Sequence, residues 1–234
     1  MCDTAVWATL GKLPEAVLRG ESAFESMKGV GLFEYFENHP ALAFSFNEFM
    51  TRRRDHGVIA RTRDFSAAIV VVDVGGGHGE TLIQILKANA HLRGVLFDLP
   101  HVVTGVTRPA PESDIAGRLV ITGGDFFEAV PEGGDLYLLE DVLHDWADED
   151  CLRILSTCRR TMRLGSELLI AERVLPESGA PAFVLSVDVF VMATLGGKER
   201  TESEFGALLD KTGFRLKGTQ HLTPMLALVS AEAV

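Results

Sequence analysis

The sequence is poor in cysteine: it has three, Cys2, Cys151 and Cys158, and no Cys-x-x-Cys pair. Small secreted proteins that depend on disulfide bonds carry more cysteines at closer spacings. Residues 1–10 also lack the basic start and the extended apolar run of a secretory signal peptide. Both absences favour a reducing compartment, and we expect a cytoplasmic protein.

Long hydrophobic runs and excess positive charge are also missing. The most apolar long segment, residues 182–195, is interrupted by Asp188 and is too short to span a bilayer, so we expect no membrane partner. Lys and Arg number 22 against 33 Asp and Glu, which gives a formal net charge of -11. This charge repels a phosphate backbone, so we expect no nucleic-acid partner.

The chain has the length and the apolar content of a folded protein. Its 234 residues are 47% hydrophobic and 24% charged, which fits one domain with an appendage or two small domains. The sequence changes character near Ser66. Residues 1–65 carry aromatic and aliphatic side chains at mixed helical spacings, and this pattern predicts two or three helices.

Between residues 66 and 234, short β-branched runs alternate with amphipathic stretches. This alternation predicts a doubly wound α/β fold, in which helices cover both faces of a mostly parallel sheet. The expected strands are residues 69–74, 95–97, 119–122, 136–139 and 168–171, and the expected helices are 79–90, 148–162, 182–195 and 201–209. Two final strands, 214–217 and 225–229, follow each other directly, so they should pair antiparallel.

A cluster of glycines follows the first expected strand, in the sequence Asp73-Val-Gly-Gly-Gly-His-Gly-Glu80. Glycines at a strand-to-helix turn let backbone N–H groups approach a ligand closely, because no Cβ stands in the way. A dinucleotide-binding loop would need a glycine where Glu80 stands, and a P-loop would need a Gly-Lys-Ser/Thr sequence that is absent. A tight turn without a ligand is the alternative that the glycines alone leave open.

Acidic residues follow the next two expected strands. Asp98 lies just beyond the second strand, and Asp125 lies just beyond the third, next to Phe126. A carboxylate at such a strand end can accept both hydroxyls of a ribose, and an aromatic ring can cover an adenine face. Each aspartate alone is compatible with a cap or turn residue. Their succession at neighbouring strand ends predicts a nucleoside site.

These features resemble the S-adenosylmethionine-dependent O-methyltransferases of the caffeate and hydroxyindole type, which include bacterial enzymes that methylate polyketide and antibiotic phenols. The matching stretches span nearly the whole chain: Phe46-Asn-Glu-Phe-Met50, Asp73-Val-Gly-Gly-Gly-His-Gly79, Phe97-Asp-Leu-Pro100, Gly124-Asp-Phe-Phe127, Leu143-His-Asp-Trp146, Ala171-Glu-Arg173 and Gly196-Gly-Lys-Glu-Arg-Thr201. The resemblance implies a Rossmann-like methyltransferase sheet with one antiparallel strand near the C-terminus. It also implies S-adenosylmethionine as cofactor, S-adenosylhomocysteine as product and a small aromatic hydroxylated substrate.

The resemblance also assigns roles to individual residues. The residues that would contact the cofactor are Gly75, Gly77, Asp98, Leu99, Asp125 and Phe126. His144 would be the general base, with Glu172 and Glu199 beside it and Asp145 near the acceptor. The residues that would line the acceptor pocket are Asn47, Met50 and Met192. Residues 1–65 would then contribute to this pocket and to a homodimer interface, and residues 66–234 would form the catalytic domain.

The sequence departs from the family pattern in two places. Members usually begin with a winged-helix domain that forms much of the dimer interface, and this sequence starts where that domain should have ended, as a short form or a fragment would. Many relatives carry a basic residue where Glu140 stands, so part of the cofactor contact differs here. Relatives that hydroxylate or decarboxylate keep the same fold, so the fold alone does not imply methyl transfer.

The chemistry favours His144 as the base independently of the resemblance. A phenol has a pKa near 10, so at neutral pH a base that removes its proton strengthens the nucleophile. His144 follows the fourth expected strand, across the sheet from the glycine loop, and a carboxylate at its other ring nitrogen would fix the tautomer. The alternative is a histidine that only begins a helix, with Glu172 and Glu199 as structural charges.

Other charged clusters have simpler interpretations. The acidic cluster between Glu140 and Asp150 could hold Mg²⁺, but residues 148–150 fit better as charges at a helix N-terminus, so we expect no metal. The basic stretch of three arginines at residues 52–54, with Arg61 and Arg63, fits a solvated helix face, and steering of an acidic substrate is the alternative. Cys151 and Cys158 share one helix face and are expected in the core.

The leading interpretation is an O-methyltransferase that acts on a phenolic hydroxyl. Three other functions are compatible with parts of the sequence. The same fold and cofactor could serve hydroxylation or decarboxylation, the chain could bind the nucleoside without catalysis, or it could be a nicotinamide oxidoreductase, which Glu80 disfavours.

Overall fold

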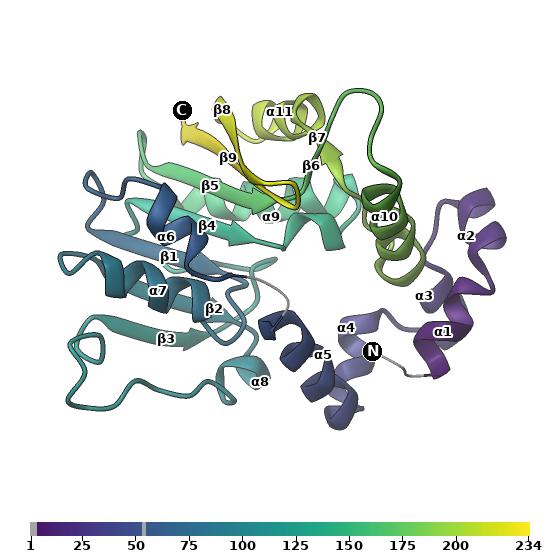
Figure 1. Cartoon of the computed structure of the whole chain (residues 1–234), viewed down its shortest axis with the longest axis horizontal. Helices are drawn as coiled ribbons and strands as arrows, with labels where there is room; N and C mark the ends of the chain where they lie inside the picture. The colour runs from purple at the N-terminus through teal and green to yellow at the C-terminus, as the bar shows by residue number, and fades with distance from the viewer. Residues whose placement is uncertain (1–3, 53–54) are drawn as a thin grey trace.

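The computed structural model of the chain describes residues 4–52 and 55–234, and the side chains of residues 6–46 and 55–234. These residues form a seven-stranded sheet with helices on both faces and a group of short helices at one end (Figure 1). The strands of this sheet are β1 (Val70–Val74), β2 (Arg93–Asp98), β3 (Leu119–Gly123), β4 (Leu136–Glu140), β5 (Glu167–Glu172), β8 (Phe214–Thr223) and β9 (Leu226–Ala233). The predicted α/β class is confirmed.

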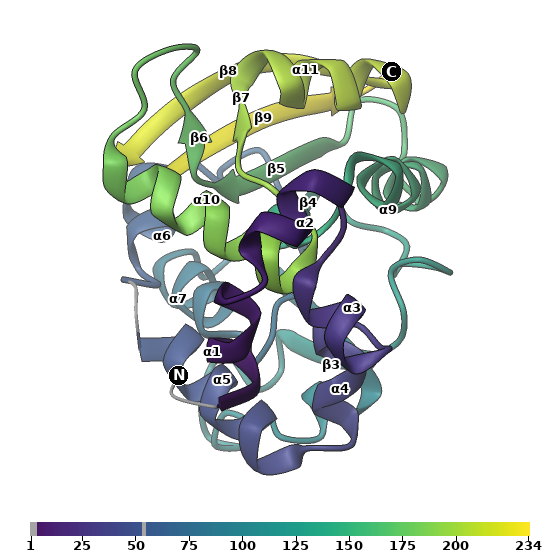
Figure 2. The same ribbon diagram turned by 90° about the vertical axis from the view of Figure 1, so that its right-hand side faces the viewer.

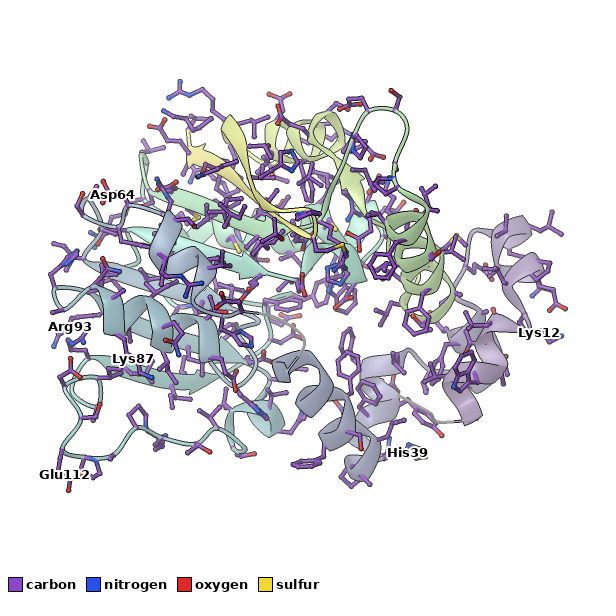
Figure 3. All side chains as sticks on the ribbon, in the orientation of Figure 1. Lys12, His39, Asp64, Lys87, Arg93 and Glu112 are labelled. Carbon is purple, nitrogen blue, oxygen red and sulfur yellow. The ribbon has the colours of Figure 1, made fainter. Side chains whose placement is uncertain are left out.

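The strand order is β3-β2-β1-β4-β5-β9-β8, and β1 to β5 are parallel. Strand β9 runs antiparallel to both of its neighbours, which confirms the expected antiparallel strand near the C-terminus. The chain reverses its direction of travel across the sheet between β1 and β4, so a crevice forms beyond the carboxyl ends of these two strands. Figure 3 shows Asp64, Lys87 and Arg93 at the opposite end of the sheet.

The central strands are buried because they are continuous apolar runs. Residues 136–139 in β4 and residues 168–171 in β5 are each at most 2% exposed. One face packs against α9 (Asp148–Thr161) and α11 (Glu202–Lys211), and the other packs against α6 (Val58–Thr62) and α7 (Glu80–Ala88). Strands covered on both faces carry such runs instead of alternating polar residues. Cys151 and Cys158 lie in the first of these cores, as expected.

The first 65 residues contain more helices than the sequence predicts. The described part of this segment forms α1 (Thr4–Leu10), α2 (Leu13–Arg19), α3 (Ala23–Lys28), α4 (Leu32–Glu37), α5 (Pro40–Arg52) and α6. The prediction of two or three helices is therefore wrong. Gly20 and Gly29 adopt left-handed conformations, with φ of 67° and 75°, and end α2 and α3. Such C-caps divide the segment into short pieces.

Helix α10 (Ala182–Leu195) has the predicted bounds and joins these short helices to the rest of the chain. It contacts α1, α2 and α3, which lie to one side of it in Figure 2.

The capping box of Thr201 and Glu204 is present at the start of α11, as predicted. The short elements α8 (Pro100–Val103), β6 (Val174–Leu175) and β7 (Arg200–Thr201) were not predicted, and β6 and β7 pair in parallel. In the part of the chain that the structure describes, no helix has the length and apolar character to cross a membrane.

Candidate active site

A cavity of about 390 Å³ lies beyond the carboxyl ends of β1, β2, β3 and β4. The six residues expected to contact a cofactor all line it: Gly75, Gly77, Asp98, Leu99, Asp125 and Phe126. Asp145, expected near the acceptor, lines it as well. The topology explains this meeting, because parallel strands bring residues that are distant in sequence to one edge of the sheet.

The glycine loop after β1 forms the floor of this cavity. Gly75 has φ of 71°, and a Cβ at this position would lie 2.9 Å from a methyl carbon of Val142. Gly77 has φ of 59°, and a Cβ there would meet no atom within 4 Å. The first glycine is therefore required by close packing and the second by its left-handed backbone, and the space over Gly77 is available to a ligand.

Asp98 lies at the end of β2, opposite the glycine loop. Its Oδ2 accepts a hydrogen bond from the backbone N–H of Gly77 at 2.8 Å, and its Oδ1 accepts one from the N–H of Leu99 at 2.7 Å. Burial raises the pKa of Asp98, and these two hydrogen bonds offset only part of the rise. Each carboxylate oxygen keeps a second lone pair, so the group can still accept the two hydroxyls of a ribose.

A second buried carboxyl group lies beneath the loop. Asp73 is 1% exposed, and burial together with the charges of Glu140, Asp98 and Glu80 raises its pKa well above the usual range. The acidic neighbours thus destabilise the charged form of Asp73. A cationic ligand in the cavity would relieve this repulsion, which suits a sulfonium better than a pyrophosphate.

Aromatic rings form the wall of the cavity that faces the N-terminal helices. Phe33 of α4 stacks on Trp146, with centroids 5.9 Å apart and an interplanar angle of 26°. Phe126 and Phe127 meet the edge of the same indole at 6.0 Å and 4.8 Å. Sequence reasoning gave Trp146 no role, although its place in Leu143-His-Asp-Trp146 was a signal. Phe33, Phe36 and Phe46 also line the cavity.

His144 lies on a 3₁₀ turn, η1 (Leu143–Asp145), that directly follows β4. Its side chain is 5% exposed and does not line the cavity. Nε2 is 3.0 Å from Oδ1 of Asp145, and Nδ1 is 3.8 Å from Oε1 of Glu172 and 3.9 Å from Oδ1 of Asp141. The imidazole is therefore surrounded by carboxylates, and Nδ1 makes no hydrogen bond.

This environment decides the protonation state of His144. Burial lowers the pKa of the imidazole, but the carboxylates of Asp145 and Glu172 have a larger, opposite effect and raise this pKa to about 10. At neutral pH the ring is therefore an imidazolium in this arrangement. It can accept a proton only after it loses its own, so a role as base needs a change at the Asp145 contact or an alkaline pH.

Glu172 supports the turn rather than pairing closely with the imidazole. Its Oε1 accepts hydrogen bonds from the backbone N–H groups of Val142, Leu143 and His144, at 3.0, 2.6 and 3.2 Å. The side chain is 1% exposed, so it stabilises the start of the turn without competition from water. This backbone role was not predicted from the sequence.

Glu199 is buried in the segment before β7 and is not among the residues that line the cavity. Its Oε1 accepts a hydrogen bond from Nε of Arg173 at 2.6 Å, and its Oε2 has no hydrogen-bond partner. Burial raises the pKa of Glu199, and the charges of His144 and Arg173 oppose this rise. The structure thus gives Glu199 a direct ion pair with Arg173 and an electrostatic influence from His144.

Of the three residues expected in the acceptor pocket, the structure describes the side chain of Met192 alone. Met192 is half-buried on α10 and is not among the residues that line the cavity. Asn47 and Met50 belong to α5, but their side chains lie outside the described residues, as do those of residues 52–54. Their proposed contact with an acceptor stays a prediction.

The acidic residues beyond the turn begin a helix. Asp148, Glu149 and Asp150 form the first turn of α9, where the helix dipole favours negative charge. Among the side chains that the structure describes, no group of three His, Cys, Asp or Glu residues is arranged to hold a metal ion.

Comparison with known proteins decides the family. A sequence model of the protein family described as the O-methyltransferase domain matches residues 10–215 of the chain. The chain belongs to the O-methyltransferase domain family.

Two curated relatives of this methyltransferase domain are 3-amino-4-hydroxybenzoate 4-O-methyltransferase from Streptomyces cremeus and a phenazine O-methyltransferase from Lysobacter antibioticus. Each is 38% identical to the chain, over 223 and 221 residues, or 94% and 93% of it. The chain covers only 61% and 64% of the lengths of these relatives.

Solved structures agree with this assignment. The mitomycin 7-O-methyltransferase MmcR has a TM-score of 0.93 at 34% identity, with 99% of this chain and 69% of that chain covered. The O-methyltransferase NcsB1 of neocarzinostatin biosynthesis, solved with S-adenosylhomocysteine and 1,4-dihydroxy-2-naphthoic acid, has a TM-score of 0.88 at 28% identity, with 98% and 69% covered.

The environment of His144 leads to a prediction about stability. Its pKa is about 10 in the folded methyltransferase domain and near 6.5 when unfolded. Its stabilising contribution is therefore complete below about pH 6.5 and is lost as the pH rises through about 10. We expect His144→Gln to lose less unfolding free energy than the wild type between these pH values, as measured by urea denaturation. His221→Gln, on an exposed part of β8, is the matched control and should behave like the wild type. Equal pH dependence in all three proteins would contradict the prediction.

Proposed function

We propose that the chain transfers a methyl group from S-adenosylmethionine to a hydroxyl group, phenolic in type, of a small aromatic metabolite. The observation that carries this proposal is the cavity that joins Asp98 and the glycine loop to the turn of His144. Membership of the O-methyltransferase domain family supports the same reaction.

The residues present fit the cofactor. Asp98 would accept the ribose hydroxyls, Gly75 and Gly77 would leave room for close approach, and Asp125 with Phe126 would flank the adenine. Relatives solved with bound S-adenosylmethionine or S-adenosylhomocysteine support this assignment. When bound, S-adenosylmethionine would supply an activated methyl group: the acceptor oxygen would bond to the methyl carbon as the bond from that carbon to sulfur breaks and S-adenosylhomocysteine leaves.

The first task of the chain is to hold the acceptor oxygen in position. Correct placement of two reactants can contribute roughly 7–11 kcal/mol to a displacement reaction. Phe33, Phe46 and Trp146 offer flat apolar surfaces for an aromatic ring next to the turn. A relative solved with 1,4-dihydroxy-2-naphthoic acid supports an acceptor of this shape.

The second task is removal of the acceptor proton, which we assign to His144. Departure of Asp145 from Nε2 would remove the largest stabilisation of the imidazolium, so the pKa of His144 would fall from about 10. With its pKa lowered, the imidazolium would release the Nε2 proton to solvent, and Nε2 could then accept the phenolic proton, while Glu172 stabilises the imidazolium that forms again. Such a base typically contributes about 10²–10⁴-fold to the rate.

We also propose that the chain forms a homodimer through the N-terminal helices. Large apolar side chains are exposed on three neighbouring helices: Trp7 of α1 is 60% exposed, Leu18 of α2 is 86% exposed and Phe183 of α10 is 66% exposed. Exposed apolar groups on helices that contact one another favour association.

Mass spectrometry of the products tests the reaction. The purified chain is incubated with S-adenosylmethionine labelled in its methyl group and with acceptor candidates such as 1,4-dihydroxy-2-naphthoic acid and 3-amino-4-hydroxybenzoic acid. We expect a labelled methyl group on an acceptor oxygen, and a rate lower by roughly 10²–10⁴-fold in His144→Gln with affinity for S-adenosylhomocysteine retained. His221→Gln should keep the wild-type rate. An added oxygen, a lost carboxyl group or an unchanged rate in His144→Gln would count against the proposal.

Calorimetry with S-adenosylhomocysteine tests the cofactor site separately. Hydrogen bonds to a charged group are worth about 1.5–3 kcal/mol, so Asp98→Asn should weaken binding by roughly 10- to 100-fold. Asp64→Asn, at the opposite end of the sheet, is the control and should bind like the wild type. Unchanged affinity in Asp98→Asn would remove this residue from the site.

A further inference from the structure

The turn that carries His144 is held by contacts at both ends. The proposed function involves only the contact with Glu172 at its start. Glu172 accepts hydrogen bonds from the backbone N–H groups at the start of the turn. Residues 196–200, which follow α10 and end at the first residue of β7, lie against the other end. A Cβ on Gly197 would collide with the carbonyl oxygen of His144 and would lie 2.7 Å from the nitrogen of Trp146. Only glycine lets this segment approach the turn so closely.

Arg200 extends from the same segment and is the largest fully buried side chain of the described residues. Its Nη1 donates to the carbonyl oxygens of Leu143 at 2.8 Å and Lys198 at 3.3 Å. Its Nη2 donates to the carbonyl oxygen of Trp146 and to Oδ1 of Asp148, both at 2.8 Å, and its Nε donates to the same carboxylate oxygen at 3.1 Å. All five N–H donors of the guanidinium are therefore used.

This arrangement is specific to arginine. Arg200 donates to the two carbonyl oxygens that bracket His144 and Asp145 in sequence: that of Leu143, which also accepts the N–H of Trp146, and that of Trp146, just beyond the turn. A buried cation also needs a counter-ion, which Asp148 supplies at the start of α9. A lysine carries the same charge but has no rigid fork, so it cannot reproduce the set of hydrogen bonds.

We propose that Arg200 is a positioning residue for His144. With Gly197, it fixes the end of the turn Leu143–Asp145, so that the imidazole is held between Asp145 and Glu172. Arg200 does not line the cavity, so it acts through the turn and not on a ligand. The inference rests on the proposed function in one respect: the position of His144 matters to catalysis because we assign it the role of base.

The pKa of His144, followed by NMR, reports this positioning directly. The ionisable groups that face the imidazole are Asp141, Asp145, Glu172 and Glu199. The titration is carried out on the protein with S-adenosylhomocysteine added, and the His144 signal is identified by its absence in His144→Gln. The measurement needs no acceptor and no turnover, so its failure is distinguishable from failure of the proposed reaction.

The informative variant is Arg200→Lys, which leaves the charge unchanged. Loosening the turn should weaken the contacts of the imidazole with Asp145 and Glu172, so the pKa of His144 should fall by roughly one unit or more. A merely electrostatic or global role for Arg200 predicts no change. Arg159→Lys is the matched control, because Arg159 also donates to backbone carbonyls, those of Met162, Gly213 and Val234 at the other end of α9.

A second variant keeps the inference testable if Arg200→Lys does not fold. Gly197→Ala changes no charge and pushes the segment away from the turn, so it should lower the pKa of His144 in the same direction. Thermal unfolding identifies the variants that are folded. An unchanged pKa of His144 in either folded variant, or an equal fall in Arg159→Lys, would overturn the inference.

Discussion

The site depends on one buried interaction, the carboxylate of Glu172 beneath the turn that follows β4. Its Oε1 accepts hydrogen bonds from three consecutive backbone N–H groups and lies 3.8 Å from Nδ1 of His144. Donors and acceptors that are removed from water must find partners within the protein, so the turn and the strand end that carries Glu172 are fixed relative to each other. The position of the imidazole over the sheet follows from this contact, and the guanidinium of Arg200 closes the other end of the same turn.

Electrostatics connect this turn to the cavity. The pKa of His144 is raised to about 10 because its carboxylate neighbours outweigh the effect of burial. At the glycine loop, burial raises the pKa of Asp98, and burial together with the charges of nearby acidic groups raises the pKa of Asp73. The cavity therefore favours positive charge in a ligand, which is consistent with the sulfonium nucleoside that we propose as cofactor.

The sequence predicted the sheet and the cavity floor well because local signals there agree with the tertiary structure. Strands β4 and β5 are apolar runs, Thr201 and Glu204 form a capping box, and Gly75 and Gly77 need their special conformations. The number of N-terminal helices was wrong, because Gly20 and Gly29 act as caps within one amphipathic segment. The ion pair of Glu199 with Arg173 and the backbone contacts of Arg200 join elements distant in sequence, and no local pattern specifies them.

A crystal structure of the chain with bound S-adenosylhomocysteine tests the central claim most directly, because it locates the ribose and the sulfur in one experiment. The account predicts that the carboxylate of Asp98 accepts hydrogen bonds from both ribose hydroxyls and that the sulfur faces the turn of His144. A ligand bound elsewhere, or one whose sulfur points away from that turn, would contradict it.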